Sequence, residues 1–303
     1  MPLRTYRRVA VVALLLLCII VVTGASVRLS GSGLGCSDWP NCESGDFISV
    51  SDPNQAIEQL NRLFTGFVSL GVAAAVLGAL RLETRRRDLV WLSVGLVAGV
   101  IGQIVLGGIT VLTHLHPVSV AAHFLLSMVL VVDATMLVWR SGQPPGPVAP
   151  AVGRTQVRAN WLAMAAGTAV LSVTGPLVTG SGPHAGDGSA RRFSFAIPDV
   201  VRVHSLSAWL FCALVVAVVV MLHRAGATSD VLRRGQVLLA VIVAQGGIGY
   251  LQYELGIPAW LVLFHVMGAT SIAIAATWFT AGLFAPAPLD AAPGTVGTEA
   301  VST

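Results

Sequence analysis

Long apolar stretches alternate along almost the whole chain with short segments that carry arginine and other polar residues. Stretches of about 18 residues or more are long enough to cross the hydrocarbon core of a bilayer as a helix. A helix also pairs its own backbone N–H and C=O groups, which find no other partner in lipid. The pattern therefore predicts an all-α integral membrane protein with eight transmembrane helices. Their expected ranges are 8–26, 59–80, 89–112, 118–139, 159–179, 200–222, 235–253 and 259–284.

The composition agrees with a membrane location and excludes several other classes. Of the 303 residues, 55% are hydrophobic and only 11% are charged, and the mean hydropathy is +0.80. Soluble globular chains are about 25% charged, and disordered chains contain far fewer apolar residues. The net charge of +4 does not indicate a nucleic-acid-binding surface, because the basic residues lie between the apolar stretches. We therefore expect the lipid bilayer as a partner and no nucleic acid.

The distribution of arginine predicts the orientation of the helices. All 18 basic residues are Arg, and cytoplasmic segments of membrane proteins carry an excess of basic residues. Most of them lie in the N-terminal segment and in the second, fourth and sixth connections. The exceptions fall on the opposite side, at Arg28, Arg62, Arg191, Arg192 and Arg202. This bias predicts a multi-pass protein of the cell (plasma) membrane with both termini in the cytoplasm.

The chain contains an internal repeat. Gln103 is followed by a glycine-rich run and then by His123, and Gln245 is followed by a similar run and then, at the same interval, by His265. An even number of helices in each unit gives the two copies the same orientation, which is a parallel repeat. The repeat predicts two four-helix bundles related by an axis along the membrane normal.

Two weaker matches agree with this repeat. A Thr-Gly pair at 23–24 matches another at 174–175, near the end of the first and fifth spans. The second span opens near Asn61 and the sixth near His204, and each stands at almost the same interval before the histidine two spans later. The two units therefore match over most of their length.

The repeat also divides the chain into parts. We expect an N-terminal four-helix unit over 1–140 and a C-terminal unit over 159–284. The segment 141–158 is expected to be a cytoplasmic linker. Residues 285–303 are rich in Pro, Ala, Gly and Thr, which is typical of a disordered cytoplasmic tail.

Three histidines lie inside the predicted spans and near their outer ends, at His123, His204 and His265. A single intramembrane histidine often makes only an interhelical hydrogen bond. Three at the same depth indicate a function instead, because ionisable side chains are expensive to place in lipid. Neutral imidazoles on facing helices are common ligands of heme iron, so His204 and His265 are expected to hold a heme.

The N-terminal unit changes this pattern at one position. Asn61 stands where the second unit has His204, and asparagine is a poor iron ligand. One histidine, His123, opposite a weak partner leaves a coordination position open for reaction or transient binding. Glu58 shares a helix face with Asn61, which puts a carboxylate near that site. The alternative is that Glu58 is only a charge at the start of an interfacial helix.

Further candidate residues lie in and beside the large loop after the first span. Cys36 and Cys42 lie close together in this loop. On the oxidising side of the membrane they favour a disulfide, with a redox-active thiol pair as the alternative. Arg28 and Arg62 lie near the outer ends of their spans, where they could pair with heme propionates or anchor the helices at the interface.

The run TGASVRLSGSGLGCSDWPNC at residues 23–42 resembles the heme A synthase family. The resemblance covers nearly the whole chain to about residue 284 and includes IEQLNR at 57–62, GGITV at 107–111, AAH at 121–123, VH at 203–204 and LFH at 263–265. The first of these motifs is the most specific.

The resemblance implies an eight-span enzyme with pseudo-twofold halves. Such an enzyme oxidises the C8 methyl group of heme O to a formyl group, with water as the oxygen source, and so makes heme A for terminal oxidases. A heme O synthase is the implied supplier of the substrate. The electron acceptor is not implied, and a quinone is one candidate.

The functional residues of the family map onto this chain one by one. The resemblance implies a heme b held between His204 and His265, and a substrate heme O held on His123 beside Glu58 as the catalytic residue. The family's disulfide pair maps onto Cys36 and Cys42, and the places of Asn61, Arg62 and Arg28 near the outer ends of their spans put these residues in the expected substrate-heme pocket.

The chain departs from the commonest family pattern at Asn61, where many members have a fourth histidine. A diheme b-type electron-transfer cytochrome without synthase activity is therefore the main alternative, and an inactive relative of the synthases is another. A parallel-repeat transporter whose His and Glu residues relay protons is an alternative from a different class. The second unit has Gly182-Pro183-His184 in place of a cysteine pair, so one disulfide is expected.

Overall fold

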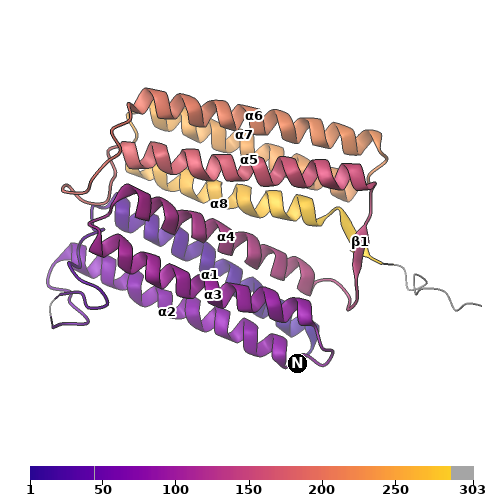
Figure 1. Ribbon diagram of the computed structural model, residues 1–303, viewed down its shortest axis with the longest axis horizontal. Coiled ribbons are helices and arrows are strands. Elements are labelled where there is room, and N and C mark those ends of the chain that lie inside the picture. The colour runs from indigo at the N-terminus through magenta and orange to yellow at the C-terminus, as the bar shows by residue number, and fades with distance from the viewer. Residues whose placement is uncertain (44, 288–303) are drawn as a thin grey trace, which may run out of the picture.

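The computed structural model describes residues 1–43 and 45–287, and its main elements are eight long helices (Figure 1). Each is long and apolar enough to cross a membrane, so the chain is a multi-pass membrane protein. The helices are α1 (Leu3–Leu29), α2 (Pro53–Leu80), α3 (Arg87–Leu112), α4 (Pro117–Ser141), α5 (Arg154–Ser181), α6 (Ile197–Arg224), α7 (Ser229–Glu254) and α8 (Ala259–Ala281).

Most helices extend beyond the apolar stretches that predicted them, because polar residues continue the helix past the hydrocarbon core. The extension of α2 matters most for the site. Asp52 caps this helix by accepting hydrogen bonds from the backbone N–H groups of Asn54 and Gln55, as N-cap carboxylates commonly do. Pro53 at the first helical position needs no such partner. The cap thus places Glu58 within the helix, although the apolar stretch begins only after it.

Two groups of four helices pack side by side. Helices α1 and α3 each contact α2 and α4, and α5 and α7 each contact α6 and α8. One buried apolar cluster is formed by residues of α1–α4 and another by residues of α5–α8. Figure 1 shows the two groups as adjacent blocks, indigo to magenta for the first and rose to yellow for the second. Contacts between the groups join α4 to α8 and α5, and α1 to α8.

The long loops α1–α2 and α5–α6 lie together at one end of the helices, here called the loop end (Figure 1). The two loops are joined by a hydrogen bond from the backbone N–H of Gly33 to the carbonyl oxygen of Gly186. Leu115, Ala185 and Ala190 form a small buried cluster beside this junction. The loop end therefore connects the two groups of helices outside their apolar cores.

The opposite end holds two elements that the hydrophobic pattern did not predict. Strands β1 (Val148–Pro150) and β2 (Phe284–Pro286) pair antiparallel, joining the segment after α4 to the chain after α8. Helix α8 consequently ends at Ala281 rather than at residue 284. The first residues of the expected tail, 285–287, belong to this ordered region, and the remainder, 288–303, lies outside the described residues.

Candidate functional site

The clearest arrangement of functional side chains lies among α5–α8. His204 on α6 and His265 on α8 face one another with ring centroids 6.2 Å apart. A metal–imidazole bond is about 2 Å long, so one metal ion bonded to both rings leaves their centres roughly 6 Å apart. The separation of the two rings therefore suits a single shared metal ion.

The described residues bring no third His, Cys, Asp or Glu side chain to this pair. Within residues 1–43 and 45–287, no group of three or more His, Cys, Asp and Glu side chains is placed to hold a metal ion. A bare ion bound by protein alone normally has four or more ligands. Two axial histidines suit an iron that already carries four ligands from a porphyrin.

Each of the three intramembrane histidines lies against a glycine of a neighbouring helix. A Cβ atom on these glycines would lie 3.1 to 3.5 Å from the Cε1 atom of the ring. The pairs are Gly107 with His123, Gly175 with His204 and Gly249 with His265. At 3.1 Å a Cβ atom on Gly249 would crowd the His265 ring, whereas at 3.5 Å one on Gly107 or Gly175 would make an ordinary contact, so the glycines bring their helices close to the imidazoles.

Two glutamines support the histidine-bearing helices in the same way. The side chain Nε2 of Gln103 donates to the carbonyl oxygen of His123 at 3.1 Å, and Nε2 of Gln245 donates to that of His265 at 2.7 Å. The sequence indicated that these residues match, but it did not indicate this bond. The same contact therefore occurs in both groups of helices.

Several polar atoms near these sites are buried without a partner in the described part of the chain. They include Nδ1 of His123, Nδ1 of His265 and Oδ1 of Asn61. Buried polar atoms in proteins nearly always have a hydrogen-bond partner, and exceptions call for an explanation.

Asn61 and His204 lie on helices that pack in the same way within their groups. Asn61 lies on α2, which packs against α1 and α3, as α6 packs against α5 and α7. His123 lies on α4, which has the place among α1–α4 that α8 has among α5–α8. The first group thus offers one imidazole where the second offers two.

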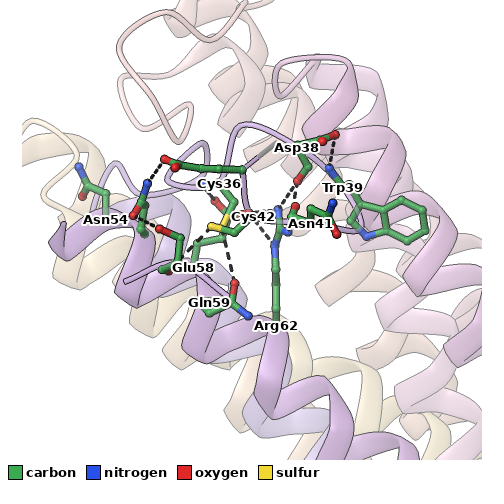
Figure 2. The surroundings of a disulfide bond; sticks show 12 residues. Cys36, Asp38, Trp39, Asn41, Cys42, Asn54, Glu58, Gln59 and Arg62 are labelled. Atoms are coloured by element: carbon green, nitrogen blue, oxygen red, sulfur yellow. Dashed lines mark hydrogen bonds and ion pairs between the residues drawn. A yellow bond between two sulfur atoms is a disulfide. The ribbon is translucent and has the colours of Figure 1, made fainter. Parts of the chain in front are cut away.

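Glu58 joins helix α2 to the disulfide-bonded loop. Its Oε2 atom accepts a hydrogen bond from the backbone N–H of Cys36 at 2.8 Å, and its Oε1 atom accepts two from Arg62, the shorter at 2.7 Å. The Glu58 residue is only 5% exposed. Figure 2 shows both side chains reaching from α2 toward the loop. Glu58 is therefore held in a fixed position by partners on two elements.

Arg62 extends this connection. Its guanidinium also donates to the carbonyl oxygens of Asp38 and Asn41 at 3.1 to 3.3 Å. Cys36 and Cys42, which flank these residues, form a disulfide and are fully buried. The disulfide prediction is confirmed, and the hydrogen bonds of Glu58 and Arg62 to the loop backbone fix the disulfide-bonded loop to α2 (Figure 2).

Trp39 of the same loop reaches the first group of helices, and the sequence analysis did not single it out. Figure 2 shows its ring projecting away from the disulfide. A Cβ atom at Gly108 of α3 would lie 2.7 Å from the Trp39 ring, so the ring packs directly on that glycine. The preceding residue, Gly107, faces His123. The loop therefore contacts the helix segment that borders His123. In the sequence, the glycine pair at 107–108 was the feature that could have indicated this contact.

Arg28 lies in the last turn of α1, at the junction of the two groups of helices. A Cβ atom at Gly186 would lie 3.1 Å from its Cγ atom, so Arg28 packs against the α5–α6 loop. Arg62 instead uses its guanidinium in the ion pair with Glu58. The two arginines thus have different surroundings, one beside the other group of helices and one inside the disulfide loop.

These features define the class of the protein as a multi-pass helical membrane protein with partly buried histidines near the loop end of its helices. The comparisons with known proteins then assign the family. The chain belongs to the COX15-CtaA family, described as a cytochrome oxidase assembly protein, whose model matches residues 7–277.

Curated relatives are similar over part of the chain. Heme A synthase of Bacillus pumilus (strain SAFR-032) is 29% identical over 43% of this chain and 43% of its own length. Heme A synthase of Lysinibacillus sphaericus (strain C3-41) is 30% identical over 40% of this chain and 39% of its own length. The aligned part of the chain therefore spans less than half the length of these relatives.

Proposed function

We propose that this protein is a heme A synthase that oxidises the C8 methyl group of heme O to a formyl group. The observation that carries the proposal is the facing pair His204 and His265, with ring centroids 6.2 Å apart, in a chain of the COX15-CtaA family. The curated relatives are named heme A synthase. The product, heme A, would serve terminal oxidases, in agreement with the family description of cytochrome oxidase assembly.

The two groups of helices are a parallel repeat in this proposal. The equivalent hydrogen bonds of Gln103 and Gln245 to the histidine carbonyls support it. So do the separate apolar clusters of the two groups. Helices α4 and α8, which carry one histidine each at matching places, contact one another. The proposal therefore puts a site in each unit, with adjacent helices between them.

His204 and His265 hold a resident heme b in the C-terminal unit. Bound there, heme b supplies a one-electron redox centre for electrons from the substrate site. The protein's own task is to present two neutral imidazoles at a fixed spacing and to exclude water around them. The apolar cluster of α5–α8 and the glycines beside the rings serve this task.

The N-terminal unit receives heme O as a substrate, with His123 as the axial ligand of its iron. Asn61, which matches His204 in the repeat, would offer the substrate iron a carbonyl oxygen rather than an imidazole nitrogen. A ligand this weak lets the substrate bind and the product leave, which a second strong ligand would hinder. Arg28 and Arg62 complete the pocket, and the Arg28 guanidinium is the better placed to meet a propionate, because Arg62 is already paired with Glu58.

Glu58 is the catalytic carboxylate of the proposal. Oε1 accepts two hydrogen bonds from Arg62, and Oε2 accepts one from the backbone N–H of Cys36. These contacts fix the orientation of a carboxylate that can accept a proton. The carboxylate also stabilises positive charge that develops on the methyl carbon during oxidation.

The chemistry balances with water and an electron acceptor. The methyl group and one water give an alcohol, two protons and two electrons. The alcohol and a second water give an aldehyde hydrate with two more protons and electrons, and the hydrate then loses water. A quinone in the membrane is the proposed class of acceptor, and a heme O synthase is the proposed supplier. We also propose that the loop end faces outward, with both termini in the cytoplasm.

The test is co-expression with a heme O synthase in a host that lacks heme A. The protein is purified, its optical spectrum is recorded, and its extracted hemes are separated by chromatography. Heme A together with heme B supports the synthase. Heme B alone overturns it in favour of an electron-transfer cytochrome, and a folded protein without heme overturns both and favours a transporter.

A further inference from the structure

The three intramembrane histidines differ at the ring nitrogen Nδ1. The Nδ1 atom of His204 lies 2.9 Å from the hydroxyl oxygen of Thr174 on α5. The Nδ1 atoms of His123 and His265 are buried without a partner in the described part of the chain. One histidine of the facing pair therefore has a second contact that the other lacks.

The hydroxyl of Thr174 has a defined role in this contact. It lies 2.9 Å from the carbonyl oxygen of Val170, one turn earlier on the same helix, and donates its single hydrogen there. Toward His204 it therefore acts as an acceptor, and the proton lies on Nδ1. Because a neutral imidazole has one N–H, the Nε2 atom of His204 is then unprotonated and free to bind a metal.

The residue next to Thr174 takes part in the same arrangement. Gly175 faces the Cε1 atom of His204, and a Cβ atom there would lie 3.5 Å away. The Thr-Gly pair thus lies against the ring at two points, with a hydrogen bond at Thr174 and close backbone packing at Gly175. Thr174 itself is only 9% exposed, so water competes little for its hydroxyl.

The matching pair in the first group of helices does not make these contacts. The hydroxyl of Thr23 donates to the carbonyl oxygen of Ile20 at 3.3 Å, and a Cβ atom at Gly24 would meet nothing within 4 Å. The residue that matches His204 in the sequence repeat is Asn61, which has no imidazole ring. The Thr-Gly pair therefore contacts an imidazole only in the group of helices whose matching position is a histidine.

We propose that Thr174 is a positioning residue for the heme b site, holding His204 as the Nδ1–H tautomer and strengthening its Nε2 atom as an iron ligand. The inference rests on the proposed ligation of heme b by His204 and His265. A hydrogen bond from Nδ1–H to an acceptor makes the imidazole a stronger electron donor. A stronger donor stabilises ferric over ferrous iron, so Thr174 lowers the reduction potential of the heme.

The experiment is a potentiometric titration of the purified holoprotein, with electron paramagnetic resonance of its ferric heme. Thr174→Val keeps the shape of the side chain but removes the acceptor. We expect a midpoint potential more positive than that of the wild type. A tenfold change in the ratio of the protein's affinities for ferric and for ferrous heme shifts the midpoint potential of this one-electron couple by about 59 mV. We also expect shifted resonance signals, because the ring is freer to rotate.

Two further variants provide the controls. Thr174→Ser keeps the hydroxyl and should restore the wild-type potential. Thr168→Val makes the same change on the same helix, where the hydroxyl hydrogen-bonds only to backbone carbonyls, and should leave the potential unchanged. An unchanged potential and spectrum in Thr174→Val would overturn the inference, as would an equal shift in Thr168→Val.

Loss of heme is also an informative result. If Thr174→Val loses heme while Thr174→Ser and Thr168→Val retain it, the hydroxyl contact with His204 is required and the inference is supported. If both variants at position 174 lose heme, packing rather than the hydrogen bond is responsible, and the inference fails. A wild-type protein without heme b overturns the proposed function itself, whereas a normal wild-type heme with an insensitive Thr174→Val overturns only this inference.

Discussion

The two groups of helices present different sites at the same end of the molecule. Among α5–α8, two imidazoles face one another and one of them is fixed by a threonine. Among α1–α4, one imidazole stands with an asparagine in the other position, and a disulfide loop packs onto the neighbouring helix. A site with two strong ligands suits a permanent redox group, whereas one strong ligand suits a molecule that must enter and leave. Under the proposed function, this difference would let one group of helices hold a permanent redox group while the other turns over the substrate.

The largest effect is expected from breaking the site among α5–α8. His265→Ala removes one of two proposed axial ligands, so the content of bound heme B should fall close to zero, measured by the Soret absorbance per mole of protein. His223→Ala is the matched control, because this exposed histidine lies at the far end of α6. Full heme content in His265→Ala would remove this residue from the ligand set.

The next largest effect is expected at the carboxylate of the first group. Glu58→Gln keeps the size of the side chain but cannot accept a proton, so formation of heme A should fall by about 10²- to 10⁴-fold while heme B is retained. Heme chromatography after co-expression with a heme O synthase measures both. Glu83→Gln, at the opposite end of the helices, serves as the control. Normal heme A formation by Glu58→Gln would show that this carboxylate has no catalytic role.

Asn61→His would make the two sites alike and so sharpen the comparison. A second imidazole opposite His123 should hold substrate heme on the order of tenfold more tightly, about 1.4 kcal/mol, and slow product release. The added heme should change from a high-spin to a low-spin optical spectrum. Asn61→Ala, which adds no ligand, should not cause this change. A high-spin spectrum in Asn61→His would mean that position 61 does not face the iron.

The smallest effect is expected from the disulfide in the α1–α2 loop, which has no counterpart in the α5–α6 loop. Cys36→Ser opens the disulfide, and closing so short a loop stabilises a fold by about 2 kcal/mol. The temperature of thermal unfolding should therefore fall slightly, with the heme B spectrum unchanged. Cys18→Ser is the control, since Cys18 is a free cysteine within α1. A folded Cys36→Ser protein with no heme A formation would instead indicate that the cysteines cycle during turnover.

The local features of this chain could be predicted, and the contacts between distant segments could not. Each of the eight helices could be predicted from an apolar stretch that is long enough to cross the bilayer. The strand pair β1–β2 joins the segments after α4 and after α8. Neither segment has a hydrophobic pattern that would predict a strand. The start of α2 at Pro53 depends on the Asp52 cap, which hydropathy does not report.

The candidate site divides in the same way. Residue type and depth were enough to single out His123, His204 and His265, because an ionisable side chain within a span is costly whatever its neighbours are. The sequence could not show that Trp39 packs on Gly108 or that Glu58 accepts from Cys36 N–H. Such contacts depend on how a loop folds back on helices that lie far from it along the chain.

By itself, then, the sequence determined the number of membrane spans, the depth of the histidines and the cysteines available for a disulfide. Only the tertiary structure decided that His204 meets both His265 and Thr174, while Arg62 turns to Glu58 and the loop. The physical reason is that burial and helix formation depend on short stretches of chain. A hydrogen bond instead requires two atoms about 3 Å apart, which only the packing of the helices establishes.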